Sequence, residues 1–137
     1  MRERAKDWRA RLDAYLDGCN GRPFQWGGLD CALFAAGAVA VMTGEDFAAS
    51  FRGKYADEAG AKAAIRAAGF GSVADIAAAH LAEIAVAEAG MGDLASVDMP
   101  GHGPCLAVVG GPHIICMTLR GKGALPLMKA NRAFRVG

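Results

Sequence analysis

The feature that most constrains this chain is an almost uninterrupted apolar run that follows a single acidic residue. The run covers residues 31–42 and begins at Cys31. Its length is too short for a helix to cross a bilayer and is typical of a helix buried in a protein core. Asp30 lies directly before it and is a favourable N-cap, because an aspartate side chain accepts hydrogen bonds from the first backbone N–H groups of a helix. The sequence therefore predicts a buried helix over residues 32–42, with Cys31 at its first turn.

The periodicity of the chain changes near Gly90. Before it, residues 4–17, 57–68 and 72–89 carry apolar or alanine-rich patterns at helical spacing. After it come short β-prone runs divided by Gly and Pro, which read GDLASV, CLAVV, HIICMTL, ALPLM and AFRV. Helices followed by strands predict an α+β domain in which the cysteine-bearing helix packs on a C-terminal antiparallel sheet. No linker or repeat divides the chain, so we expect one domain over residues 1–137.

Composition excludes several classes of protein. Hydrophobic residues make up 53% and charged residues 21%, which is typical of a globular chain rather than a disordered one. The net charge of +1 creates no strong field for nucleic acid or anionic lipid. The charged start is not followed by an apolar leader region, so we expect synthesis in the cytoplasm and no membrane insertion. The N-terminal basic residues are interpreted as a solvated helix face; they are Arg2, Arg4, Lys6, Arg9 and Arg11.

The cysteines show no spacing typical of metal ligands, so the sequence predicts neither a metal nor another cofactor. Cys31 itself has two interpretations. The positive end of a helix favours a thiolate, and Gly27 and Gly28 before it allow a sharp turn with room for an extended substrate. Cysteine is also among the most buried residue types, so Cys31 could equally be a small core thiol. Position alone leaves a nucleophile and a core residue open.

Residues 23–31, PFQWGGLDC, resemble the active-site entrance of the NlpC-like cysteine peptidases, which are papain-fold domains that cut the peptide stems of bacterial cell walls. The family pattern continues with a Gly-Asp-Leu strand and a hairpin that carries the catalytic histidine. Residues 92–94 and the hairpin around Gly110 follow here in the same order. The resemblance implies a papain-like fold in which Cys31 is the nucleophile. It also implies that the substrate is bound by residues at the entrance, namely Trp26, Gly27, Gly28 and Asp30.

The chain is most similar to a compact branch of these domains found in phage, prophage and gene-transfer-agent tail clusters. The similarity is carried by the middle segment TGEDFAASFRGKY, residues 43–55, and by the ending AFRVG, residues 133–137, in which Phe134 stands where tryptophan is usual. It implies a tail-tip or tail-assembly protein. Such a protein would move from the cytoplasm to the virion tail and contact other tail or baseplate proteins.

Three positions depart from the family pattern. Phe24 lacks the hydroxyl of the family tyrosine, and the slot of the catalytic histidine, counted back from the hairpin, falls on Pro104. The third polar partner would lie near Cys116, where the sequence is apolar. His102 lies two residues before the histidine slot and keeps the same strand face, so it is the candidate base. General acid–base help contributes about 10²–10⁴-fold, so a site with Cys31 alone would be a poor amidase.

The register of the hairpin determines which histidine can act as the base for Cys31. A two-residue turn at residues 110–111 would place His113 opposite Val108, beyond hydrogen-bonding reach of the thiol. The same register would set Cys105 opposite Cys116 as a pair of buried thiols.

Three functions stay open at this point. The first is a tail component that cleaves peptidoglycan stem peptides through Cys31 with His102 as base. The second is a structural or interaction module that keeps the fold without the reaction. The third is a cytoplasmic thiol acyltransferase, since papain-like folds host such chemistry. In all three, Arg52 and Tyr55 are interpreted as structural residues that tie residues 51–55 to the core, with a substrate-carboxylate clamp as the alternative for Arg52.

Overall fold

The computed structural model describes residues 2–137 and has the predicted α+β fold. The helices come first in the chain: α1 (Trp8–Gly18), α2 (Cys31–Thr43), α3 (Glu58–Ala67) and α4 (Val73–His80). The strands are β1 (Ala82–Ile84), β2 (Leu94–Met99), β3 (Gly103–Val109), β4 (His113–Thr118), β5 (Gly121–Pro126) and β6 (Arg132–Arg135). Two short 3-10 helices, η1 (Val86–Glu88) and η2 (Leu127–Lys129), lie between strands.

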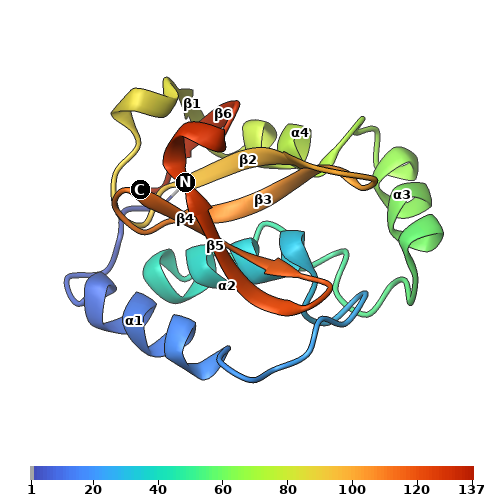
Figure 1. The fold of residues 1–137 in the computed structure, drawn as a ribbon, viewed down its shortest axis with the longest axis horizontal. Helices are drawn as coiled ribbons and strands as arrows, with labels where there is room; N and C mark the ends of the chain where they lie inside the picture. The colour runs from blue at the N-terminus through green and yellow to red at the C-terminus, as the bar shows by residue number, and fades with distance from the viewer. Residues whose placement is uncertain (1) are drawn as a thin grey trace.

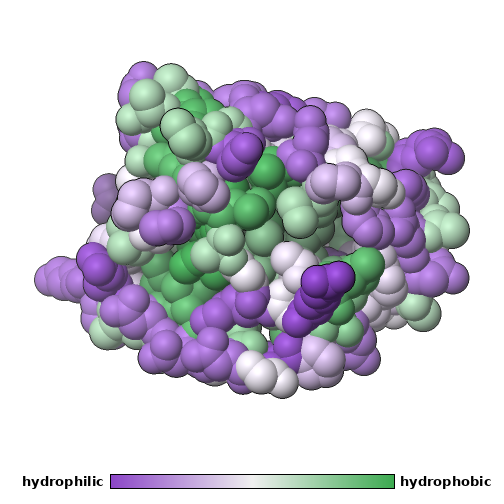
Figure 2. Space-filling view, in the orientation of Figure 1, coloured by the Kyte–Doolittle hydropathy of each residue, from purple (hydrophilic) through white to green (hydrophobic). Residues whose placement is uncertain are grey.

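The strands form one six-stranded antiparallel sheet in the order β1-β6-β2-β3-β4-β5. Helix α2 lies across the sheet against β3 and β4, and α1 packs on the other side of α2 (Figure 1). Helix α4 contacts β3 and β6. In Figure 2 hydrophobic residues gather in the middle of the same view and hydrophilic residues surround them. The contacts of α2 with α1, β3 and β4 enclose it between α1 and the sheet, as its apolar sequence predicted.

Helix α2 confirms the expectation drawn from the apolar run. It begins at Cys31 and ends at Thr43, and Gly44 closes it in the left-handed conformation with φ of 82°. Its buried residues face α1 on one side and the sheet on the other. Burying each large apolar side chain stabilises the fold by about 1.5–3 kcal/mol, so this helix is a principal source of stability.

Both faces of the central strands are buried, and the residues alternate between them. One face packs against α2 through Leu94, Leu106, Val108, Met117 and Phe134. The other face forms a second apolar cluster, made of Ala95, Val97, Ala107, Val109, Ile114 and Cys116. Leu125 of β5 and Leu127 of η2 are partly buried and pack against that second cluster, so this face of the sheet is covered as well.

The predicted helix over residues 72–89 is wrong in its second half. Helix α4 ends at His80, and Leu81 is already extended, with φ of −125° and ψ of 151°. Residues 82–84 then form β1 and pair with β6. Alanine-rich sequence favours a helix locally, but pairing with an edge of the sheet overrides that preference. The N-terminal helix also begins later than predicted, at Trp8 rather than at residue 4.

The hairpin between β3 and β4 has a different register from the predicted one. Val108 pairs with Ile115 and Val109 with Ile114, so Gly110 and His113 flank a two-residue turn at residues 111–112, one residue later than predicted. Gly110 N–H donates to the His113 carbonyl at 2.8 Å. Gly111 has a positive φ of 83° and Pro112 lacks an N–H group, which together favour a turn centred on these two residues rather than on the Gly-Gly pair. The predictions that His113 faces Val108 and that Cys105 faces Cys116 across the hairpin are therefore wrong.

Arg4 joins the two ends of the chain and does not belong to the solvated basic face. Its guanidinium donates to the carbonyls of Val136 and Met91, at 2.7 and 2.8 Å, and to Asp93 Oδ1 at 2.9 Å. It also lies over the ring of Trp8, 4.3 Å from the ring centroid. Asp93 in turn accepts the Val136 N–H at 3.0 Å. The other basic residues of the segment are exposed, as predicted.

No helix within residues 2–137 has the length and hydropathy needed to traverse a membrane.

We predict that Arg4→Met lowers the free energy of unfolding by about 3 kcal/mol, because it leaves Asp93 buried without its cationic partner. Arg9→Met is the matched control, since Arg9 forms an exposed pair with Asp13 at 3.8 Å and should change stability by less than about 0.5 kcal/mol. Chemical denaturation followed by circular dichroism measures both. Equal effects of the two substitutions would contradict this account of Arg4.

Candidate functional site

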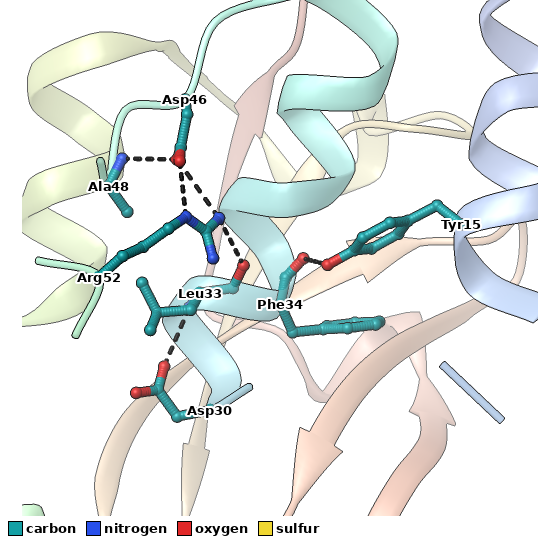
Figure 3. A network of polar contacts seen from close by, with 7 residues as sticks. All are labelled: Tyr15, Asp30, Leu33, Phe34, Asp46, Ala48 and Arg52. Carbon is teal, nitrogen blue, oxygen red and sulfur yellow. Dashed lines mark hydrogen bonds and ion pairs between the residues drawn. The ribbon is translucent and has the colours of Figure 1, made fainter. Parts of the chain in front are cut away.

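The site is organised around the buried carboxylate of Asp30, which is 2% exposed. Its Oδ1 accepts the Leu33 N–H at 3.0 Å and so caps α2 (Figure 3). Its Oδ2 accepts the Gly27 N–H at 3.1 Å and the Tyr55 hydroxyl at 2.6 Å. One carboxylate therefore holds together the glycine turn, the start of α2 and the loop that ends at Tyr55, and it sets Cys31 at the first position of the helix.

Gly27 is required by the close approach of two backbone segments. It has a positive φ of 77°, and a Cβ atom at this position would overlap the Tyr55 carbonyl oxygen. Its own carbonyl accepts the Gly53 N–H at 2.8 Å. Gly27 is buried in these contacts, whereas Gly28 is exposed. The sharp turn predicted for the two glycines is present, and their role in substrate binding stays a prediction.

Arg52 ties the same loop to α2. Its guanidinium donates to Asp46 at 2.6 Å and to the Leu33 carbonyl at 3.2 Å (Figure 3). Tyr15 of α1 donates its hydroxyl to the Phe34 carbonyl at 2.8 Å. The first turn of α2 is thus held by side chains from three directions. These contacts confirm that Arg52 donates to a carboxylate and a carbonyl of its own chain, as the structural interpretation expected.

A cavity of about 250 Å³ opens beside Cys31, between α3 and the start of β3. A smaller one of about 50 Å³ lies on the other side, between the Phe24 loop and β4. The two share the residues Trp26, Cys31, His102 and Cys105. They therefore form the two arms of one groove that meets at the Cys31 thiol.

The side chain that meets Cys31 is Cys105 of β3, which shares a hydrogen bond with its thiol. The predicted histidine slot, Pro104, lies one residue earlier and also lines the larger cavity. A thiol thus stands beside Cys31 where the family resemblance implies an imidazole.

The two thiols have opposite tendencies to ionise. The hydrogen bond that the Cys31 S–H donates to Cys105, burial and the nearby charges of Cys105 and Asp30 raise the pKa of Cys31, and together they outweigh the lowering by the Leu106 N–H. The same thiol–thiol hydrogen bond lowers the pKa of Cys105. At Cys31, the Asp30 charge opposes the favourable field of the helix terminus. Cys31 is therefore the member of the pair that keeps its proton.

His102 lies at the rim of the groove. Its Nδ1 is 3.1 Å from Glu58 Oε2 of α3, and its side chain is 36% exposed. Hydrogen bonds from Lys62 and then His102 lower the pKa of Glu58. His113 is exposed at the start of β4 and lines neither arm of the groove. The structure brings His102 and Cys31 to one cavity, and a role for His102 as the base stays a prediction.

Sequence reasoning missed Cys105 and Glu58 as site residues. The alternation in CLAVV could have shown that residues 105, 107 and 109 share a strand face, but it gives no sign of which face Cys31 meets. The Glu58 contact depends on how α3 packs, which no local pattern encodes. Over residues 2–137 no group of three metal-ligating side chains is placed to hold an ion.

Comparison with known proteins gave a family and a fold. A family model described as "Domain of unknown function (DUF6950)" matches residues 3–136. No curated protein matches. Among solved structures, the crystal structure of the NlpC/p60 domain of peptidoglycan hydrolase SagA is similar, with a TM-score of 0.61 and 20% sequence identity. The match covers 92% of this chain and 97% of that one, so the fold is NlpC-like.

The ionisation of the thiol pair predicts an order of modification. Iodoacetamide should modify Cys105 faster than Cys31 between pH 6 and 7, because a lowered pKa increases the thiolate fraction and a raised one decreases it. Cys105→Ala should bring the pKa of Cys31 down, since it removes the largest cause of the increase. Peptide mass mapping across pH measures both rates, and Cys19→Ala is the control. Faster labelling of Cys31 in the unsubstituted protein would contradict the assignment.

Proposed function

We propose that this chain, which belongs to the family described as Domain of unknown function (DUF6950), is a non-hydrolytic peptide-binding module of a phage-type tail. The observation that carries the proposal is the pairing of Cys31 with the Cys105 thiol beside an open groove. The fold is similar to that of the NlpC/p60 domain of a peptidoglycan hydrolase, and an open groove lies beside Cys31. The residue next to the nucleophile position, however, favours binding without bond cleavage.

The chemistry of amide hydrolysis explains why the thiol pair matters. A cysteine peptidase needs a thiolate for attack and a protonated group to deliver a proton to the leaving amine. The pKa of Cys31 is raised and that of Cys105 is lowered, so Cys31 is the harder of the two thiols to ionise. A thiolate beside a thiol offers no imidazolium for the leaving amine. Acylation through Cys31 is therefore slow even when a peptide lies correctly in the groove.

The groove itself suits an extended peptide that carries carboxylates. Ile65 and Phe70 contribute apolar wall, and Lys62 and Arg66 of α3 contribute cationic groups to the same cavity. Lys62 also pairs with Glu58 at 3.1 Å, so a ligand carboxylate would compete with that ion pair. Trp26 lines both arms and packs edge-on against Phe24, with ring centroids 4.8 Å apart. Cell-wall stem peptides combine small apolar side chains with free carboxylates, so they are the ligand class we propose. The likeness to a domain of a peptidoglycan hydrolase supports that choice.

The tail setting is supported by the resemblance of residues 43–55 and 133–137 to the compact tail-cluster branch. The middle segment has a structural basis for its pattern here. Arg52 and Tyr55 hold the start of α2 through Leu33 and Asp30, so the segment supports the groove. We propose that the module is delivered by the tail to the cell wall and contacts neighbouring tail or baseplate proteins.

A second candidate function is hydrolysis of stem peptides with Cys31 as nucleophile and His102 as base. It is favoured by the shared cavity of the two residues and by the Glu58 carboxylate on His102 Nδ1. A carboxylate on one ring nitrogen leaves the other available as an acceptor, as in other nucleophile–base pairs. In this reading Glu58 is a positioning residue.

One experiment separates the two functions. We expect the unsubstituted protein to bind soluble stem peptides, measured by calorimetry, and to release no new amine from purified cell walls. Lys62→Ala together with Arg66→Ala should weaken binding by about tenfold, since each exposed contact to a carboxylate contributes a fraction of a kcal/mol to about 1 kcal/mol. Arg9→Ala is the matched surface control.

The opposite result would be peptide release that disappears in both Cys31→Ala and His102→Ala. That outcome would replace the binding module with the hydrolase. Absence of both binding and release would exclude stem peptides as the ligand.

The tail proposal has its own test. We expect the chain to be present at a fixed ratio to tail proteins in particles purified from a strain that produces them, measured by quantitative mass spectrometry. A free cytoplasmic pool with none in purified particles would contradict a tail location and favour the acyltransferase alternative.

A further inference from the structure

The thiols at the junction of the two groove arms differ from the other cysteines in accessibility. Cys31 and Cys105 are both partly exposed and line both arms, whereas Cys19 and Cys116 are buried. Cys116 reaches only the smaller arm. All are free in this structure. The groove thus presents two neighbouring thiols, from α2 and from β3, to any molecule that enters it.

We propose that Cys31 and Cys105 form a redox-active dithiol that closes to a disulfide by exchange with a small peptide disulfide. The two residues are 74 positions apart in the sequence, and the packing of α2 on β3 brings their thiols into contact. The cavity of about 250 Å³ on one side gives access to them. Lys62 and Arg66 in its wall are complementary to the carboxylates of a peptide disulfide.

The step balances without any further reactant. The Cys105 thiolate attacks one sulfur of the peptide disulfide, forms a mixed disulfide and releases a peptide thiolate. Cys31 then gives its proton to the released peptide thiolate, and the Cys31 thiolate attacks the Cys105 sulfur and expels the second peptide thiolate. The two protein sulfurs are oxidised by two electrons in total, and the peptide disulfide is reduced to two thiol-containing peptides.

The environment assigns the order of the two attacks. Cys105 is the first nucleophile because the hydrogen bond from Cys31 favours its thiolate, although burial and the charges of Glu58, Asp30 and Asp98 oppose it. Cys31 is held close by, and formation of the mixed disulfide removes the Cys105 thiolate whose hydrogen bond raises its pKa. Each attack is made by a thiolate, so this order supplies one at each of the two steps. The proposed exchange does not require that the protein is part of a tail.

The test uses the full chain and glutathione disulfide as the probe. Reduced protein is incubated at graded ratios of reduced to oxidised glutathione, quenched with acid, and its remaining thiols are counted after unfolding with a maleimide. We expect the four thiols to fall to two, and peptide mapping to find Cys31 joined to Cys105. Cys31→Ala should stop at a mixed disulfide on Cys105. Cys19→Ala is the matched control and should still form the crosslink.

Three results would overturn the proposal: four thiols that stay free at the most oxidising ratio, a stable glutathione adduct on Cys105 of the unsubstituted protein, or a crosslink from Cys105 to Cys116. Mapping of the unsubstituted protein decides among these even if a variant fails to fold. Circular dichroism before and after oxidation checks that the crosslink forms in the native state.

Discussion

The arrangement of the site depends on the buried carboxylate of Asp30. It accepts donors from the glycine turn, from the first turn of α2 and from Tyr55, so three segments distant in sequence meet at two oxygen atoms. A buried carboxylate that loses a partner is strongly unfavourable, and the three segments are therefore ordered together. Arg52 also connects the loop that ends at Tyr55 to the first turn of α2, because its guanidinium donates to the Leu33 carbonyl. This network sets Cys31 at the first turn of α2.

The groove and the reactive centre rest on different residues. The walls of the groove come from α3, the turn that contains Trp26 and the strands. The environment of the Cys31 thiol depends instead on which β3 side chain contacts it. Here that residue is Cys105. In the functions proposed above, one side chain on a strand therefore decides among peptide hydrolysis, thiol exchange and binding alone, with no change in the fold.

How much could be predicted from the sequence differs between elements. The Asp30 cap, the apolar run and the Gly-divided β runs act locally, and they predicted α2 and the late antiparallel strands. Strand β1 was missed because its sequence favours a helix and only pairing with β6 makes it extended. The Cys105 contact was missed because it depends on how α2 packs on β3, which no local pattern encodes. Long-range packing, such as Glu58 on His102, leaves no local signature at all.

The contact of Arg4 with Val136 has a practical consequence for handling the molecule. Both ends of the chain leave the surface close together, where Ala5 N–H also bonds the Met42 carbonyl at the C-terminal end of α2 (Figure 1). Cys31 lies at the opposite end of that helix, about 20 Å away for its 13 residues. A tether or fusion partner attached at either end therefore points away from the groove, and the protein can be immobilised on a surface with its thiols facing the solution.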